Sequence, residues 1–486
     1  MIDPFERRTK IVATIGPASD DVATLRALVA AGMDMARLSL AHGPLEETLE
    51  RIDRVRRAAE DEGRIVGVLA DLPGPKVRAA RFPDEGVYLN EGDTTELVGG
   101  DDDDATSDWQ RIAIDRVEAV EQLRAGDRVA LGDGGIVLTV ERVETGTAFA
   151  RVLTGGRVRG RPGVVLPPGR FAEPTPTPED LRLLRSLCSA GVDAVAISFV
   201  RSAADVERVR AAAGDDPPML VAKIETQEAV DAIDEVISVS DGVMVARGDL
   251  GIRCAMEDVP HYQKKIIRTG VAYGRPVITA TQMLESMVRA PVPTRAEVSD
   301  VANAVFDGTS ALMLSGETAI GRDPAGAVET MSRIAARAER EFNFEAWGRA
   351  LGRQQIVESH GAPAPVRITA AISAAGWRAA TDAEATALIA CTNTGATARA
   401  ISRFRPRIPI VAATPSLRTA RQLSVAWGIT PLVVDRQGST DDIVWFAVQA
   451  AAKSGIVKED DVVAVLVGSP DDPEPATDVL RLVRIR

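Results

Sequence analysis

Eight short apolar runs, each followed by an amphipathic stretch, limit the folds open to this chain more than any other feature of its sequence. Most of the runs are apolar on both faces, which is typical of parallel strands covered by helices. They span residues 10–16, 33–40, 64–72, 192–199, 219–225, 241–250, 275–282 and 310–316. Eight alternations of strand and helix predict an α/β chain folded as a closed (β/α)8 TIM barrel, with a doubly wound open sheet as the alternative.

The regular spacing breaks between the third and fourth runs. Short alternating strands and turn glycines in this interval, such as LRAGDRVALGDGGIVLTVERVE, predict an inserted small β-barrel over residues 76–170. The large barrel then comprises residues 1–75 and 171–345. Beyond GAPAP at 361–365, further alternations of strand and helix predict a separate C-terminal α/β domain over residues 355–486.

Composition excludes several classes of function. The chain has 45% hydrophobic residues but no apolar run of the roughly 20 residues that a membrane span needs, so we expect no membrane association. Three widely spaced cysteines argue against a disulfide framework or a structural zinc site. A net charge of −13 disfavours nucleic acid as a partner. The N-terminus MIDPFERRTK lacks a following apolar segment, which predicts a cytoplasmic location, and the acidic run Asp101–Asp104 is expected to be a solvated loop.

Charged residues gather where the apolar runs end, which is the face of a (β/α)8 barrel that carries active sites. The fifth run ends with Lys223 and Glu225, which strand alternation places on the same face, and the sixth ends with Arg247, Gly248 and Asp249. Two carboxylates from neighbouring strands would repel each other unless a cation lay between them. Glu225 and Asp249 therefore predict a Mg²⁺ or Mn²⁺ site, and the alternative is a salt bridge from Lys223 to either acid.

Three further polar groups point to the same rim. Gly248 leads into a possible short helix whose free N–H groups could hold a substrate carboxylate, although a simple turn would look the same. Arg37 ends the second run and offers the fork of donors that suits phosphate, although alone it could form a salt bridge. Thr281 closes the seventh run, where a helix cap is the alternative. Together these strand ends favour a binding site for an anionic substrate.

Taken with their flanking residues, these segments resemble those of pyruvate kinases. The matching stretches follow that family's order from about residue 8 to the end of the chain: TKIVATIGPAS, GMDMARLSLAHG, DLPGPKVR, VAKIE, SDGVMVARGDLG, PVITATQMLESM and PTRAEVSDVANAVFDGTSALMLSGETA. The resemblance implies that the inserted domain is a lid and that the C-terminal domain binds an effector. It also implies the conversion of phosphoenolpyruvate and ADP into pyruvate and ATP.

The resemblance assigns roles position by position. It implies that Glu225 and Asp249 hold the divalent metal, and that Lys223 stabilises the phosphoryl group during transfer. Arg37 would grip the phosphate, while Gly248, Asp249 and Thr281 would hold the carboxylate end of the substrate, with Thr281 also near the face where the enolate is protonated. Nucleotide-side positions carried over from the family are Ser39, His42, Arg78 and Arg161.

Some positions depart from the family pattern. Two oxygen donors that bind potassium in many members are lost, because the segments read Ser39-Leu40-Ala41-His42 and Asp71-Leu72-Pro73-Gly74-Pro75-Lys76. Lys76 stands where potassium-dependent members carry Glu, so its ammonium, together with Asp71, is expected to substitute for the monovalent cation. We therefore expect the enzyme not to need K⁺.

The nucleotide side departs more strongly, since Pro162 replaces a lid lysine, Ile320 alters the GETAKG pattern, and LGVEIP has become LGIRCA at 250–255. Two alternatives to an ordinary pyruvate kinase stay open on these grounds. One is a metal-dependent aldolase or lyase acting through a pyruvate enolate. The other is a slow or regulatory member of the family with altered nucleotide use.

The segment CTNTGATAR resembles the family loop that holds a sugar-phosphate effector. Its hydroxyls suit a phosphate, but the common arginine is Ala396 here, and a turn followed by a helix cap is the alternative. The residues expected at a phosphorylated effector are Thr392, Asn393, Thr394, Gly395 and Thr397. By analogy with the family we also expect a homotetramer.

Overall fold

The computed structural model describes residues 7–41, 43–100, 105–132, 134–167, 174–358, 363–468 and 476–486. Eight parallel strands close into a barrel in the order β1-β16-β15-β14-β13-β12-β3-β2. They are β1 Lys10–Thr14, β2 Met35–Ser39, β3 Gly67–Asp71, β12 Ala194–Ile197, β13 Met219–Ile224, β14 Gly242–Ala246, β15 Val277–Ala280 and β16 Ala311–Leu314. Each falls inside one of the eight predicted runs, which confirms the closed barrel and excludes the open sheet.

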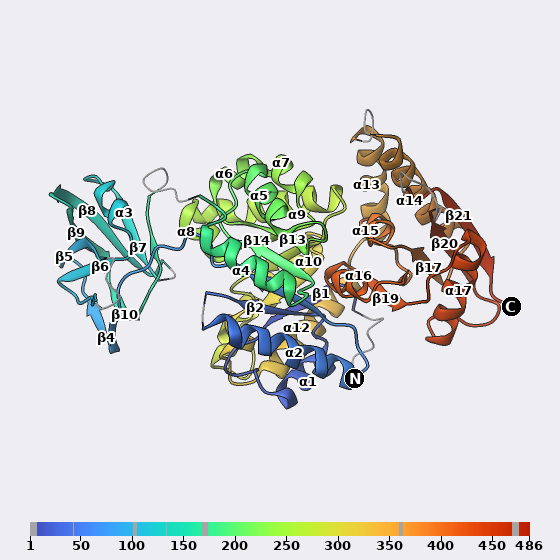
Figure 1. Cartoon of the computed structure of the whole chain (residues 1–486), viewed down its shortest axis with the longest axis horizontal. Helices are drawn as coiled ribbons and strands as arrows, with labels where there is room; N and C mark the ends of the chain where they lie inside the picture. Colours follow the sequence, from blue (N-terminus) through green and yellow to red (C-terminus); the bar gives the residue numbers. More distant parts are fainter. Residues whose placement is uncertain are drawn as a thin grey trace.

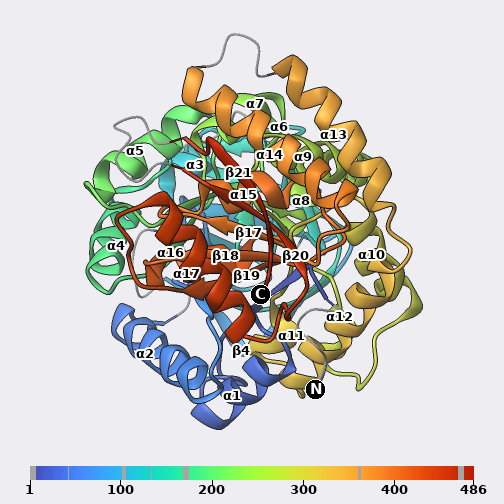
Figure 2. The same ribbon diagram turned by 90° about the vertical axis from the view of Figure 1, so that its right-hand side faces the viewer.

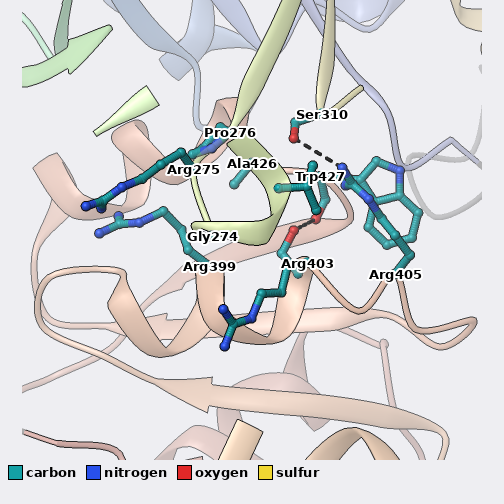
Figure 3. Close-up of a pocket in the computed structure, with 11 residues that line it drawn as sticks. Gly274, Arg275, Pro276, Ser310, Arg399, Arg403, Arg405, Ala426 and Trp427 are labelled. Atoms are coloured by element: carbon teal, nitrogen blue, oxygen red, sulfur yellow. Dashed lines mark hydrogen bonds between the residues drawn. The ribbon is translucent and has the colours of Figure 1, made fainter. Parts of the chain in front are cut away.

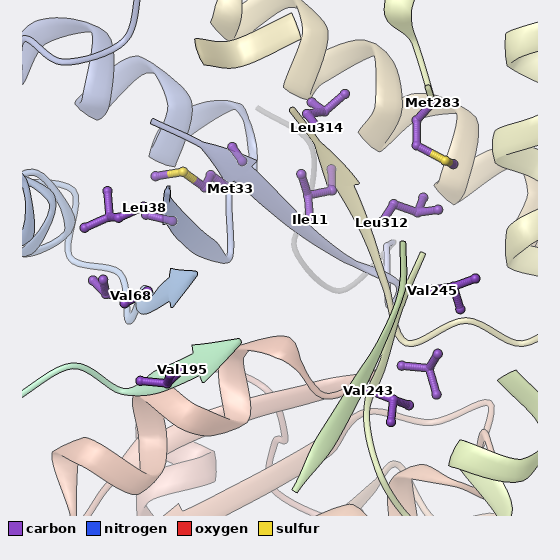
Figure 4. Close-up of a cluster of buried hydrophobic side chains, with 14 of the residues drawn as sticks. Ile11, Met33, Leu38, Val68, Val195, Val243, Val245, Met283, Leu312 and Leu314 are labelled. Atoms are coloured by element: carbon purple, nitrogen blue, oxygen red, sulfur yellow. The ribbon is translucent and has the colours of Figure 1, made fainter. Parts of the chain in front are cut away.

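Helices surround the barrel because each strand buries apolar side chains on both of its faces. In β14, Val243 and Val245 pack outward against helices, whereas Met244 packs inward with side chains of the other strands. Figure 4 shows part of the outer layer of this core, with Ile11, Leu38 and Leu312 on neighbouring strands. The surrounding helices are α1 Val22–Ala31, α2 Leu45–Asp61, α4 Pro178–Ser189, α5 Ala203–Ala213, α6 Gln227–Asp231, α7 Ile233–Val239, α8 Arg247–Arg253, α9 Val259–Ala272, α10 Arg295–Phe306, α11 Gly316–Ala319 and α12 Pro324–Glu339.

The inserted domain follows β3 and has a core of its own, from Val77 to Leu166. It consists of a six-stranded sheet, ordered β11-β7-β8-β9-β5-β6, and a two-stranded ribbon of β10 and β4, and isolated bridges pair residues 78–81, just before β4, with Gly163, Ile114 and Thr106. Its ladder is thus less continuous than that of the small barrel expected from the sequence. The elements are β4 Phe82–Leu89, β5 Thr94–Gly99, β6 Arg111–Ile114, α3 Val117–Glu121, β7 Arg128–Leu131, β8 Ile136–Glu144, β9 Thr147–Thr154, β10 Gly156–Gly160 and β11 Val164–Val165. The acidic run 101–104 lies outside the described residues.

The C-terminal domain is a five-stranded sheet, ordered β19-β18-β17-β20-β21, with helices on both faces. Figures 1 and 2 show it at the opposite end of the barrel from the inserted domain. Its buried Val425 packs with the inward-facing side chains of the barrel, so the two domains share a core. Its elements, with the helix α13 that leads into it, are α13 Phe344–Glu358, α14 Ala364–Asp382, β17 Ala387–Cys391, α15 Ala396–Ser402, β18 Ile410–Thr414, α16 Leu417–Gln422, β19 Ile429–Val433, α17 Thr440–Lys453, β20 Val462–Val467 and β21 Val479–Arg484.

No helix within the described ranges is long and apolar enough to cross a membrane.

Candidate active site

A chain of buried charges crosses the C-terminal ends of four neighbouring barrel strands, β2, β3, β12 and β13. Arg37, at the end of β2, places Nε 2.8 Å and Nη2 2.7 Å from Asp71 Oδ2. The other oxygen of Asp71, at the end of β3, lies 3.3 Å from Lys223 Nζ. Lys223 in turn donates to Ser198 Oγ, 2.7 Å away just beyond β12. One carboxylate therefore fixes both of the cations that the sequence placed at this rim.

Glu225 lies at the floor of this site and is fully buried. Its Oε2 accepts a hydrogen bond of 2.8 Å from the backbone N–H of Phe199. Its Oε1 lies 2.9 Å from Lys223 Nζ, so the salt bridge considered as an alternative is present. This contact lacks hydrogen-bond geometry, however, and among the described residues Oε1 has no hydrogen-bond partner. A carboxylate has several lone-pair sites, so this buried oxygen beside the Lys223 ammonium could still accept a metal ion.

Charge in this network shifts the protonation of its members. Burial raises the pKa of Glu225, and the negative charge of Asp249 raises it further, while Lys223 opposes both effects. Burial alone would lower the pKa of Lys223, but Asp71 and Glu225 more than offset this and raise it. Burial likewise opposes ionisation of Asp71, yet Lys223 and Arg37 hold its pKa below the ordinary value. The pairing therefore keeps both Lys223 and Asp71 charged at neutral pH.

Asp249 lies half-buried in α8 and completes the set of carboxylates. The two cations and three carboxylates, Arg37, Lys223, Asp71, Glu225 and Asp249, leave the cluster with a net charge of −1. No group of three or more histidine, cysteine or acidic side chains in the described part of the chain is arranged to bind a metal. Glu225 and Asp249 are close enough to interact electrostatically, and one or two carboxylates are the donor set that often holds a hard divalent ion.

Thr281 and Gly248 are brought together, but in a different way from that expected. The backbone N–H of Gly248 donates to Thr281 Oγ1 at 2.8 Å, and this hydroxyl donates to Ala280 O at 2.6 Å. The N–H of Gly248 is therefore not free for a substrate carboxylate, because Thr281 caps the start of α8. Thr281 has a φ of 67°, in the left-handed region that a non-glycine residue seldom adopts. Strain of this kind is often found where a side chain is held for function.

Sequence reasoning missed three groups beside this network. Ser198 and the backbone of Phe199 follow β12, where a polar residue ending the apolar run was the available signal. The third is Arg253 in α8, whose Cζ lies 4.8 Å above the Phe199 ring. Arg253 Nε is buried and has no hydrogen-bond partner among the described residues. The half-buried guanidinium of Arg253 therefore lies over Phe199, whose backbone N–H binds Glu225.

The expected nucleotide side lies at the hinge between the barrel and the inserted domain. Arg78 donates from Nη2 to Ala41 O at 3.4 Å and from Nη1 to Arg161 O at 3.3 Å, which ties the hinge to the loop after β2. Arg161 is half exposed, and its Nη2 lies 3.8 Å from Asp115 Oδ2. Ser39 is half-buried at the end of β2, and His42 lies outside the described residues. The structure thus collects two cations, Arg78 and Arg161, beside this loop.

Lys76 does not reach Asp71, whose partners are Arg37, Ser198 and Lys223. It is exposed and lies against the inserted domain, where a Cβ added to Gly163 would meet Lys76 Cε at 3.0 Å. Asp71 is thus paired with two other cations, and the side chain of Lys76 is exposed. Ile320 is 64% exposed, so an apolar side chain lies on the surface where the family's GETAKG pattern has a charged lysine.

A second cleft, of about 390 Å³, opens in the C-terminal domain around the segment that begins α15. Thr392, Asn393, Thr394 and Thr397 line it, as the effector prediction requires, and Arg436 contributes a cation that sequence reasoning missed. Gly395 has a φ of 81°, and its N–H donates to Thr392 Oγ1 at 2.9 Å, so the loop is also the turn that was considered as an alternative. The cleft thus offers several hydroxyls and one cation, Arg436, next to one carboxylate, Asp435.

Comparison with known proteins agrees with this architecture. The family model described as "Pyruvate kinase, barrel domain" matches residues 6–328, and the one described as "Pyruvate kinase, alpha/beta domain" matches residues 370–483. A "Pyruvate kinase" of Clostridium acetobutylicum is 38% identical over 98% of this chain and 99% of its own length. One of Methylorubrum extorquens is 38% identical over 98% and 97%, and "Pyruvate kinase 2" of Synechocystis is 40% identical over 99% and 79%.

Fold, buried charges and relatives together define the class as an enzyme that transfers a phosphoryl group. Within that class, the chain belongs to the pyruvate kinase family.

Proposed function

We propose that this protein transfers the phosphoryl group of phosphoenolpyruvate to ADP, giving pyruvate and ATP as a step of glycolysis. The observation that carries the proposal is the buried network of Arg37, Asp71, Lys223 and Glu225 at the C-terminal ends of three barrel strands, β2, β3 and β13. Burying four charges for stability alone is unfavourable, since a hydrophobic replacement is often at least as stable. Such a network would be useful in a site that stabilises the charge of a phosphoryl group during its transfer.

Each side chain would act by its position. Of the five N–H donors of a guanidinium, Arg37 uses three on Asp71 and Thr14, which leaves two for the phosphoryl oxygens. Lys223 would neutralise charge on the transferring group, and Asp71 holds it in place for that role. A Mg²⁺ or Mn²⁺ ion held by Glu225 and Asp249 would polarise substrate oxygens and stabilise the enolate. Thr281 would position α8, and through it Gly248 and Asp249, against the carboxylate end of the substrate.

The inserted domain would serve as a lid that excludes water during transfer. Its loop already touches α8, since a Cβ added to Gly134 would meet Ile252 Cγ1 at 3.1 Å. In Figure 1, α8 lies between the barrel and this domain. Closing the lid would protect the phosphoryl group from hydrolysis.

The nucleotide would bind at the hinge. Ser39, His42, Arg78 and Arg161 are the side chains that we assign to ADP. Pro162 and Ile320 cannot supply the charge that lysines supply in other members, so Arg253 is our candidate for part of the missing charge. It stands half-buried beside the site and has no carboxylate partner among the described residues. Nucleotide preference would then depend on arginines rather than lysines.

We further propose that turnover does not require K⁺, because Ala41 and Leu72 have no side-chain oxygen to offer it and Lys76 brings a fixed positive charge. Because a pyruvate kinase draws on the nucleotides and metabolites of the cytoplasm, we assign the protein to that compartment.

The C-terminal domain would bind a phosphorylated effector in the cleft around Thr392, Thr394 and Arg436. It would also contribute to a homotetramer, since β21 is an edge strand with an unpaired side. Trp445 is 57% exposed and Leu482 48% exposed beside this edge, which are large apolar groups to leave uncovered.

A coupled assay with phosphoenolpyruvate, ADP and Mg²⁺ tests the proposal directly. Pyruvate formation with equimolar ATP, abolished by chelating the divalent ion, is the expected result. Formation of pyruvate without ATP would point to a lyase, and turnover with GDP or UDP but not ADP would point to altered nucleotide use. No turnover with any nucleoside diphosphate would overturn the proposal.

A further inference from the structure

A small cavity lies where the C-terminal domain meets the barrel (Figure 3). It is at the N-terminal ends of β15 and β16, whereas the candidate active site is at the opposite ends of the strands. The enclosed space is about 10 Å³, which is room for roughly one water-sized atom. Four arginines line it, Arg275 from the barrel side and Arg399, Arg403 and Arg405 from the C-terminal domain. We refer to this cavity and its four arginines as the arginine pocket.

Arginines supply all of the charge on the lining of the arginine pocket. Its lining contains no Asp or Glu. Asp241 acts electrostatically on Arg275 and Arg399, but its side chain is 3.1 Å from Arg210, with which it forms an ion pair. Glu339 acts on Arg405, but its two oxygens accept hydrogen bonds from the backbone N–H groups of Arg8 and Thr9. An excess of cations thus faces the interface between two domains.

Arg405 is the deepest member of the pocket and is only 2% exposed. Its Nη2 donates to Gly308 O at 2.7 Å and to Ser310 Oγ at 3.3 Å, and its Cζ lies 4.6 Å from the Trp427 ring. Its Nε and Nη1 are buried and have no hydrogen-bond partner within the described ranges. Burial lowers the pKa of Arg405 to about 9, so it is still charged at neutral pH. A buried charged group with two free donors is costly unless something accepts from them.

The backbone at Arg405 is also held in an unfavourable conformation. Its φ is 52°, a left-handed value that a side chain with a Cβ seldom adopts. Packing on Trp427 and the bonds to Gly308 and Ser310 keep it there, and they direct the guanidinium toward the cavity. At the other side of the cavity, Arg275 Nε is likewise buried and has no hydrogen-bond partner in the part of the chain that the structure describes. Figure 3 shows the guanidinium groups of Arg275 and Arg399 side by side.

We propose that the arginine pocket is a binding site for a small anion, which accepts hydrogen bonds from Nε and Nη1 of Arg405 and is attracted by the charge of the other three arginines that line the pocket. The size of the cavity limits what can enter to a halide ion or to one oxygen of an oxyanion such as phosphate, whose remaining atoms would stay at the mouth. Guanidinium donors suit both. The anion would neutralise part of the positive charge and thereby fasten the C-terminal domain to the barrel.

A hydrogen bond also links the arginine pocket to the cleft in the C-terminal domain. Arg399 Nη1 donates to Thr394 O at 3.2 Å, so one of the pocket's arginines holds the backbone of the loop that lines that cleft. An anion that attracts the guanidinium of Arg399 would therefore change the hydrogen bond from Arg399 to the backbone of Thr394. This inference does not depend on the proposed reaction, since it concerns stability and anion binding in the intact protein.

Thermal unfolding of the full-length protein tests the site. We would titrate sodium bromide or sodium phosphate against sodium gluconate at constant ionic strength. A saturable rise of the unfolding midpoint with one of the two anions is expected. Arg405→Met should weaken that response at least tenfold, while Arg333→Met, an exposed arginine on α12, should leave it unchanged. If Arg405→Met fails to fold, Arg275→Gln and Arg399→Gln take its place.

Crystals of the wild-type protein soaked in bromide or phosphate identify the anion. An anomalous peak from bromide within hydrogen-bonding distance of Arg405 Nε would assign the site to halides, and tetrahedral density at the mouth would assign it to an oxyanion. The proposal is overturned if water alone fills the cavity in both soaks. It is equally overturned if the midpoint of Arg405→Met rises as much as that of the wild type.

Discussion

Asp71 fixes the geometry of the candidate active site, because one buried carboxylate contacts both Arg37 and Lys223. Its side chain is 3% exposed, so the ion pairs are little screened by solvent. Sequence reasoning gave Asp71 only a supporting part beside Lys76. Its position at the end of β3, between the strands that carry Arg37 and Ser198, indicates a larger one.

Lys223→Met tests whether the ammonium stabilises the transition state. Loss of one preorganised charge of this kind typically lowers kcat by about 10²–10³, and we expect a fall in that range with a much smaller change in the KM for phosphoenolpyruvate. Steady-state kinetics of the coupled assay measure both. Lys265→Met is the matched control, since its Nζ only bonds Val230 O outside the barrel. Equal losses in the two variants would contradict a catalytic role for Lys223.

Arg253→Gln tests the source of charge on the nucleotide side. If Arg253 contacts a phosphate, losing a charge-assisted hydrogen bond should raise the KM for ADP by about 10-fold or more. The KM for phosphoenolpyruvate should stay within about twofold, because Arg37 and Lys223 are unchanged. Arg337→Gln, an exposed arginine that pairs with Glu341, serves as control. A KM for ADP that does not move would assign Arg253 to packing on Phe199 alone.

The order of elements was predictable because each barrel strand is apolar on both faces, and all eight predicted runs contain a strand. The pairing of Lys223 with Glu225 followed from alternation within one strand. The roles of Ser198 and Asp71 did not, because they depend on β12 lying between β3 and β13, which only the closed barrel specifies. The hydrogen bond from Gly248 to Thr281 could not be predicted from the sequence either, since it requires the strained backbone at Thr281.

At the opposite ends of the strands, Asp34 ties β1 and β2 to the chain entering the barrel. It is 5% exposed, with Arg7 Nη1 and the N–H of Ile11 both 2.9 Å from its Oδ2. Burial alone would raise the pKa of Asp34, but Arg7, Lys10 and Arg64 hold it below its ordinary value. A carboxyl with a depressed pKa contributes stability above its unfolded pKa and loses that contribution as pH falls through the folded one.

Asp34→Asn should therefore destabilise the protein at pH 7 by about 3–5 kcal/mol, the usual cost of breaking a buried pair. The difference from the wild type should shrink as pH falls below about 4, where the carboxyl begins to protonate. Urea unfolding at several pH values measures this. Asp216→Asn, which removes an acid that is 87% exposed and pairs with Arg418, should change stability by less than about 1 kcal/mol at any pH. A pH-independent loss in Asp34→Asn would contradict the electrostatic account.

At the scale of the whole molecule, the inserted domain and the C-terminal domain lie at opposite ends of the barrel. The inserted domain meets the C-terminal ends of the strands, next to Lys76 and Arg78, while the C-terminal domain packs on the other ends through Val425. If the inserted domain closes over the barrel, Lys76 and Arg161 would move together with the bound nucleotide. In the described arrangement Lys76 lies against Gly163 of the lid and is exposed, so it can be replaced without disturbing a buried contact.

Lys76→Glu is the substitution that should convert the enzyme to potassium dependence. If the ammonium replaces a bound cation, the wild type should turn over equally in Na⁺ and K⁺ buffers. The variant, which gains a negative charge where a positive one was needed, should lose at least about 10-fold in kcat without K⁺, and added K⁺ should restore part of it. Lys76→Gln is the matched control, because it removes the charge without creating a ligand, and K⁺ should not rescue it. A strong rise of wild-type turnover on adding K⁺ would show instead that the site still binds a monovalent cation through backbone oxygens.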